Sequence, residues 1–151
     1  MTNETVNQSS SENVFTSSQR VSSYELDSFG HVNNSVFLNY LERARGDFLL
    51  SKDLRFADFK RWDRFPIVIR ANLEFKAPAF ADDKILVKGR LSNATATSFT
   101  MDYEIFNRAD DRLLLIAQTV HVFVNKNNRP SRIPEEFKNK FITQCLGSQQ
   151  M

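Results

Sequence analysis

The longest periodic stretch of the chain predicts one amphipathic helix that begins at Asn33 or Asn34. Either asparagine can cap a helix, because its side chain accepts a hydrogen bond from a free amide of the first turn. The apolar stripe of this helix consists of Phe37, Leu41, Ala44 and Phe48. Further apolar residues flank the stripe, so the apolar arc is broad. We therefore expect a sheet to wrap around the helix.

Elsewhere the apolar period falls to two, which is typical of strands. The expected strands are residues 15–24, 67–75, 85–91, 99–105 and 113–124. The last of them is apolar on both faces and is expected to be a central strand. Short connections such as 107–111 favour antiparallel hairpins. The order of elements predicts an α+β fold, in which one long helix is wrapped by a curved five-stranded antiparallel sheet.

Composition divides the 151 residues into one domain and two tails. Residues 1–14 are polar and are expected to form a disordered N-terminal tail. The domain is expected over 15–142, with a C-terminal tail at 143–151. Within it, 51–65 is expected to be a packed connection or short helix, and 134–141 a short closing helix. The 14 phenylalanines either fill the core or line an apolar cavity.

Charge and residue counts exclude several classes of function. A net charge of +2 is too small to indicate general nucleic-acid binding. The chain has no secretory signal and no apolar run long enough to span a bilayer, so we expect a cytoplasmic protein. The single cysteine, Cys145, supports neither a disulfide nor a cysteine-based metal site. His31 and His121 are too far apart in the sequence to indicate a metal site.

The segment 27–34 carries the groups that acyl transfer needs. It places a carboxylate, an imidazole and two amides directly before the helix. Amides at a helix start can hold an oxyanion or polarise the carbonyl of a thioester. The carboxylate of Asp27 can attack that carbonyl, or take a proton from an attacking water. Gly30 lets the backbone approach a ligand closely. A purely local role, as a turn acceptor and helix caps, explains the same residue types.

The block from Tyr24 to Arg45 resembles the 4-hydroxybenzoyl-CoA thioesterase-like family of hotdog-fold acyl-CoA thioesterases. The similarity lies in Tyr24, Asp27, the run Gly30-His31-Val32-Asn33-Asn34, and the following Phe37-Leu38-x-Tyr40-Leu41-Glu42-x-Ala44-Arg45. The stretches 75–79 and 129–134 are also similar to that family. In all, the resemblance covers residues 16–141.

This resemblance implies a hotdog thioesterase that hydrolyses an acyl-CoA to free acid and CoA. No separate cofactor is implied, because CoA is part of the substrate. The family forms homodimers, or dimers of dimers, whose sheets join edge to edge and whose active sites lie at the subunit interface. Its catalytic carboxylate corresponds to Asp27, as nucleophile or general base. Its carbonyl-polarising amide corresponds to the backbone N–H of Asn34.

Four further residues are expected at the site through the same resemblance. His31 either acts on the substrate, by orienting water or by binding the thioester, or satisfies a backbone carbonyl near the dimer interface. Gly30, Asn33 and Glu42 are expected to contact substrate. For Glu42 the alternative is a structural pair with Arg45 at i, i+3.

Five basic residues in the expected connections are candidates for the CoA phosphates. They are Arg61, Arg64, Lys126, Arg129 and Arg132. Three alternative functions stay open. The run His-Val-Asn-Asn is similar to acyl-ACP thioesterases, so the acyl carrier is open. A hotdog hydratase and a non-catalytic acyl-CoA-binding protein are the others.

Overall fold

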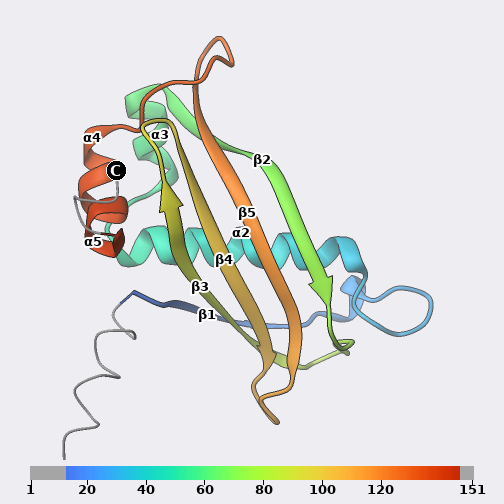
Figure 1. Ribbon diagram of the computed structural model, residues 1–151. Coiled ribbons are helices and arrows are strands. Elements are labelled where there is room, and N and C mark those ends of the chain that lie inside the picture. Colours follow the sequence, from blue (N-terminus) through green and yellow to red (C-terminus); the bar gives the residue numbers. More distant parts are fainter. Residues whose placement is uncertain (1–12, 147–151) are drawn as a thin grey trace, which may run out of the picture.

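The computed structural model describes residues 13–146 and places five antiparallel strands in one sheet of order β1-β3-β4-β5-β2. Figure 1 shows the long helix α2 crossing behind the strands. The elements in chain order are β1 (Phe15–Arg20), η1 (Ser23–Glu25), α2 (Asn34–Ser51), α3 (Phe56–Trp62), β2 (Arg64–Phe75), β3 (Lys84–Ala94), β4 (Ser98–Asn107), β5 (Leu113–Asn125), α4 (Glu135–Phe137), η2 (Lys138–Ile142) and α5 (Thr143–Leu146).

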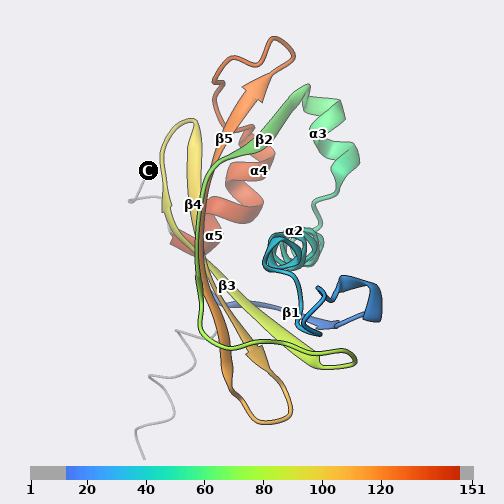
Figure 2. The same ribbon diagram turned by 90° about the vertical axis from the view of Figure 1, so that its right-hand side faces the viewer.

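The sheet curves around α2, which Figure 2 shows end-on in the concave face. This confirms the predicted α+β architecture. The side chains that α2 buries are Phe37, Tyr40, Leu41, Ala44 and Phe48. They include the whole predicted stripe, and Asn33 is the N-cap. Burying a broad apolar arc on one side of a curved sheet removes most of the helix's apolar area from water.

One contact between α2 and β3 depends on a glycine. A Cβ built at Gly89 would lie 2.5 Å from Cε2 of Phe48 and 2.9 Å from its Cζ. The Phe48 ring is 1% exposed, so it cannot swing away into water. The missing side chain at Gly89 therefore sets how closely the helix approaches the sheet.

The edge strand β2 departs from the predicted alternation. A bulge interrupts its pairing with β5 between Val68 and Arg70. Ile67 and Val68 before it and the bulged Ile69 are 43%, 45% and 58% exposed, so consecutive side chains are accessible where alternate burial was expected. The bulge adds an unpaired residue, and no strand formed by residues 13–146 covers the outer edge. β2 also begins at Arg64, before the expected residue 67.

The C-terminal segment forms three short helical pieces in place of the single helix expected over 134–141. These are α4, the π-helical turn η2 and α5, and α5 falls within the expected tail 143–151. Cys145 and Leu146 pack against the core from α5. Burial raises the pKa of the Cys145 thiol. Residues 1–12 and 147–151, most of the two expected tails, lie outside the described residues.

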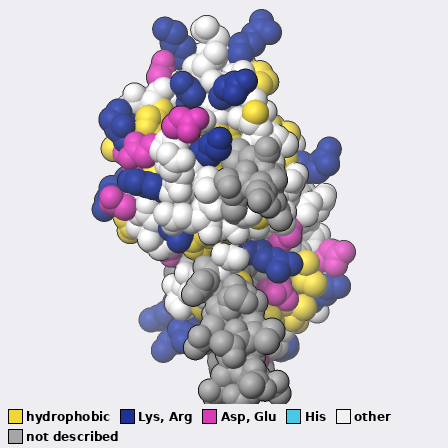
Figure 3. All heavy atoms as spheres, turned by 60° about the vertical axis from the view of Figure 1, so that its left-hand side comes forward, with side chains coloured by type: hydrophobic (Ala, Val, Ile, Leu, Met, Phe, Trp, Pro, Cys, Tyr) yellow, Lys and Arg dark blue, Asp and Glu magenta, His cyan; other side chains and the backbone are white. Residues whose placement is uncertain are grey.

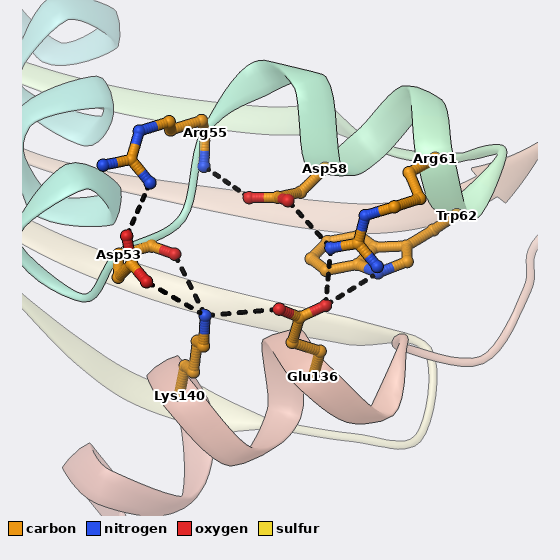
Figure 4. Close-up of polar contacts among 7 residues, drawn as sticks. All are labelled: Asp53, Arg55, Asp58, Arg61, Trp62, Glu136 and Lys140. Atoms are coloured by element: carbon orange, nitrogen blue, oxygen red, sulfur yellow. Dashed lines mark hydrogen bonds and ion pairs between the residues drawn. The ribbon is translucent and has the colours of Figure 1, made fainter.

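A ring of ion pairs, closed by one backbone hydrogen bond, joins α3 to the C-terminal helices (Figure 4); its members are Asp53, Arg55, Asp58, Arg61, Glu136 and Lys140. Arg61 donates to Asp58 at 2.8 Å and to Glu136 at 2.7 Å, and Lys140 lies 3.2 Å from Glu136. The indole N–H of Trp62 also donates to Glu136. Exposed pairs of this kind stabilise a fold only weakly. They fix the position of α3 relative to α4 and η2.

The surface carries charges of both signs. On the face in Figure 3, basic and acidic side chains are interspersed and form no single-sign patch. Across residues 13–146, no helix combines the length and the apolar character that crossing a bilayer requires.

His121 is a buried polar residue on the inner face of β5. Its Nε2 lies 2.7 Å from Oγ1 of Thr119, and its ring stacks on Phe99 at a centroid distance of 4.6 Å. His121 is thus a hydrogen-bonded residue of the sheet interior. Burial lowers the pKa of His121 from 6.5 to about 3, and the positive charge of Arg45 adds to the shift. The imidazole is therefore neutral at physiological pH.

The buried imidazole makes stability depend on pH. The unfolded chain protonates His121 below pH 6.5, whereas the folded chain does so only near pH 3. Folding therefore loses stability as pH falls through this window, by about 2 kcal/mol between pH 7 and 5. We expect urea unfolding at pH 7 and pH 5 to show a smaller loss for His121→Gln than for the wild type. The exposed His31→Gln is the control, and an equal loss in all three proteins would contradict the assignment.

Candidate active site at the start of helix α2

The loop 27–31 is held at both of its ends. Leu26 and Val32 form an antiparallel bridge that closes it. The N–H of Val32 donates to the carbonyl of Ala79 at 2.9 Å, and the N–H of Asn33 donates to that of Glu25 at 3.0 Å. The loop is thus fixed to the segment after β2 and to η1 just before α2 begins.

Glu25 anchors the loop to α2 from the other side. Its Oε1 accepts hydrogen bonds from the N–H of Ser22 at 2.7 Å and from the hydroxyl of Tyr40 at 3.1 Å. Burial raises the pKa of Tyr40, and the negative charge of Glu25 raises it further. The phenol therefore stays protonated and keeps donating to Glu25.

Asp27 is half-buried and is oriented by the loop's own backbone. Its Oδ1 accepts from the N–H groups of Phe29 and His31 at 2.9 and 3.3 Å. Its Oδ2 accepts no hydrogen bond from any residue in 13–146. Gly30, at the tip, has φ +82°, a conformation that costs other L-residues free energy. The turn therefore leaves one carboxylate oxygen available for chemistry.

The first turn of α2 leaves one amide free. The N-cap Asn33 accepts from the N–H of Ser35 through its side chain at 3.0 Å and from the N–H of Val36 through its carbonyl at 2.9 Å. The N–H of Asn34 donates to no acceptor in the described chain. Because this unpaired donor lies at the positive end of the helix, it can polarise a carbonyl or hold an oxyanion.

His31 is exposed beside this amide. Its ring packs edge-on against Phe80 at a centroid distance of 5.1 Å. Its ring nitrogens bond to no backbone carbonyl of residues 13–146. The alternative role of His31 was to donate a hydrogen bond to a backbone carbonyl. Within the described part of one protomer, no carbonyl accepts such a bond.

Glu42 lies away from the loop, on the middle of α2. It lines a cavity of 290 Å³ between α2, α3, the start of β2 and the inner face of the sheet. The alternative pair with Arg45 does not form, because no carboxylate of a described residue lies within 4 Å of the guanidinium. One protomer thus brings together Asp27, Gly30, His31, Asn33 and Asn34, but not Glu42.

The candidate phosphate ligands separate into three groups. Arg64 and Arg132 line a groove of 670 Å³, where Arg64 donates to the Arg132 carbonyl at 2.9 Å. Lys138, which the sequence analysis did not select, lines the same groove. Arg61 is bound in the ion-pair ring of Figure 4. Lys126 and Arg129 are exposed in the turn after β5.

The chain is similar to known thioesterases. The family model described as Thioesterase-like superfamily matches residues 21–141. A chloroplastic acyl-acyl carrier protein thioesterase of Arabidopsis thaliana is 32% identical over 123 residues, which cover 82% of this chain. The match covers 65% of that relative, so the chain spans just under two thirds of its length.

Two further matches are named for the hydrolysis of 1,4-dihydroxy-2-naphthoyl-CoA. A 1,4-dihydroxy-2-naphthoyl-CoA hydrolase of Synechocystis is 32% identical over 112 residues, covering 74% of this chain and 81% of the relative. The crystal structure of a 1,4-dihydroxy-2-naphthoyl-CoA thioesterase from Synechocystis superposes with a TM-score of 0.80 at 26% identity. It covers 91% of this chain and 99% of its own. This likeness confirms the hotdog fold.

Gly30 provides a test of the loop. We expect Gly30→Ala to lower the free energy of unfolding by about 1–2 kcal/mol, because alanine is strained at this positive φ. Gly30→Asn is expected to lose less, because asparagine tolerates this region better. Gly46→Ala is the control, since Gly46 is in α2 with no atom near a built Cβ, and it should stabilise. Urea unfolding measures all three, and equal effects at both glycines would contradict the strained turn.

Proposed function

Because the chain belongs to the thioesterase-like superfamily, we propose that it hydrolyses an acyl-CoA thioester to a free acid and CoA. One observation carries the proposal. A half-buried carboxylate with a free oxygen, Asp27, lies in the anchored loop, and an unpaired helix amide, Asn34 N–H, follows that loop at the start of α2. Thioester hydrolysis needs both groups, one to deliver or become the nucleophile and one to stabilise the developing oxyanion.

Two routes use these groups in the same positions. In both, the Asn34 N–H donates to the thioester oxygen as negative charge builds on it. In the first, Asp27 attacks the carbonyl carbon, the C–S bond breaks to release CoA thiolate, and water hydrolyses the mixed anhydride. In the second, Asp27 takes a proton from water as the water attacks; collapse of the tetrahedral intermediate then expels the thiolate, which is protonated.

A homodimer completes this site. β2 is an edge strand of 12 residues that exposes a row of apolar side chains, and such an edge favours pairing with another strand. A two-fold pairing of β2 with its copy makes a continuous sheet. In Figure 1 the loop before α2 lies on the β2 side of the sheet. The partner's Glu42, and the cavity that it lines, then lie beside the loop.

The CoA portion extends from that interface toward basic residues. Arg64 is the first residue of β2, so the groove that it shares with Arg132 and Lys138 lies at one end of the paired edge. Guanidinium groups at such a groove suit the phosphates of CoA. Glu135 and Glu136 also line the groove, and their charges limit its net positive potential.

The alternative functions differ from the proposed one in the acyl carrier or in the reaction catalysed. The Arabidopsis relative is named for acyl carrier protein substrates, so parallel assays with acyl-CoA and acyl-ACP identify the carrier. Hydration of an enoyl-CoA without CoA release would indicate a hydratase. Tight acyl-CoA binding without thiol release would indicate a binding protein. We propose a cytoplasmic location.

Asp27→Asn tests the carboxylate directly. Asparagine keeps an oxygen that accepts from Phe29 and His31, so the loop and the melting temperature should be preserved. We expect kcat for thiol release to fall by about 10²- to 10⁴-fold. Asp110→Asn is the matched control, because Asp110 also accepts a backbone N–H in a turn but lies in the β4–β5 hairpin. Unchanged turnover in Asp27→Asn would refute the role of Asp27.

The edge pairing predicts linked changes in mass and activity. Ile69 is 58% exposed on β2, and Ile116 is 38% exposed on β5. We expect Ile69→Lys to convert a two-chain particle to a single chain in light scattering, since like charges would meet across the pairing. Thiol release should fall with it. Ile116→Lys should retain both properties, and a stable active dimer of Ile69→Lys would exclude this interface.

A further inference from the structure

The cavity beside Glu42 combines an apolar wall with a cation. Phenylalanines from three elements, Phe59 of α3, Phe99 of β4 and Phe137 of α4, form much of its lining. Its volume is 290 Å³, which is room for roughly ten non-hydrogen atoms at the ~30 Å³ that a water molecule takes in the liquid. Arg45 lines the same space. A saturated acyl chain would have no use for this charge.

Arg45 is a half-buried cation without a charged partner in the described chain. Its Nη1 donates to the hydroxyl oxygen of Tyr103 at 3.2 Å, its one hydrogen bond to a described residue. A guanidinium has five N–H donors. Removing such a group from water is unfavourable unless acceptors replace the lost hydration. Several of its donors therefore have no acceptor among the described residues and are open to water or to a ligand.

Arg45 begins a series of hydrogen bonds that continues through Tyr103 and Thr119 to His121. Oη of Tyr103 lies 2.7 Å from Oγ1 of Thr119, which lies 2.7 Å from Nε2 of His121. Because Arg45 can only donate, all bonds are satisfied when Tyr103 donates to Thr119 and Thr119 donates to His121. The neutral His121 then carries its proton on Nδ1, where no described residue accepts it. This series of hydrogen bonds thus has a free donor at each end, on the Arg45 guanidinium and on Nδ1 of His121.

These donors point to the chemistry of the acyl group. We propose that the cavity binds an acyl group that carries a hydrogen-bond-accepting oxygen, as an oxo, hydroxyl or carboxylate substituent, and that Arg45 recognises this oxygen. The proposal rests on the proposed thioesterase function. The apolar walls take the carbon skeleton, and the oxygen supplies the acceptor that Arg45 lacks. A purely hydrocarbon group leaves the donors unpaired and binds less well.

Matched substrate pairs test the preference. Thiol release is measured for 4-hydroxybenzoyl-CoA against benzoyl-CoA, and for 3-oxo-octanoyl-CoA and 7-carboxyheptanoyl-CoA each against octanoyl-CoA. In at least one pair we expect kcat/KM to favour the oxygenated member by roughly 10- to 100-fold, the usual worth of a hydrogen bond to a charged group. The three arms separate the ring hydroxyl, the chain oxo group and the carboxylate.

Arg45→Met should abolish that preference while the parent substrate is still turned over. Arg43→Met is the matched control on the exposed side of α2 and should keep it. Should Arg45→Met fail to fold, Arg45→Lys replaces it, because lysine keeps the charge but loses the planar fork and is expected to reduce the preference. A preference that survives in every folded Arg45 variant overturns the proposal.

Binding separates this proposal from the proposed function. The same pairs are titrated calorimetrically into Asp27→Asn, and into Asp27→Asn combined with Arg45→Met. Tighter binding of an oxygenated acyl-CoA, lost in the double variant, supports the recognition by Arg45 even if no substrate is ever hydrolysed. Equal values for both members of every pair, in turnover and in binding, overturn the recognition even if hydrolysis is fast.

Discussion

The contact between the Phe48 ring and the bare backbone of Gly89 sets the distance between α2 and the sheet. A helix wrapped on one side must press against its sheet along its whole length, because any gap forfeits dispersion contacts and any excess side chain forces strain. This close packing makes α2 a rigid frame. Its first amide at one end and the side chains along its middle therefore hold fixed positions relative to each other.

That frame separates two chemical regions. From Asn34 to Glu42 the helix rises about 12 Å, so the loop and the cavity of one protomer are not adjacent. In the proposed homodimer, pairing of the two β2 edges would bring the loop of one protomer beside the cavity of its partner. Asp27 is fixed by backbone hydrogen bonds within its loop, and it lines neither the 290 Å³ cavity nor the 670 Å³ groove.

The sequence predicts what depends on local periodicity and capping. The stripe of α2 and the Asn33 cap follow from spacing and side-chain chemistry alone, and the segment 27–34 stands out by its carboxylate, imidazole and amide side chains. The bulge near Ile69 and the π-helical turn η2 carry no local signal. The hydrogen bonds that link Tyr103, Thr119 and His121 depend on the register of β4 against β5. Alternation of apolar and polar residues along each strand does not determine that register. Lys138 joins the Arg64 groove only through the tertiary fold.

Cys145 has a practical consequence for studying this chain. It is the chain's one cysteine, it is half-buried against the core, and burial raises its pKa. Reagents that report free thiols by disulfide exchange react with the thiolate, whose fraction at neutral pH is reduced at this position. Colour that develops rapidly with such a reagent therefore reports coenzyme released from substrate, with little background from the folded protein itself.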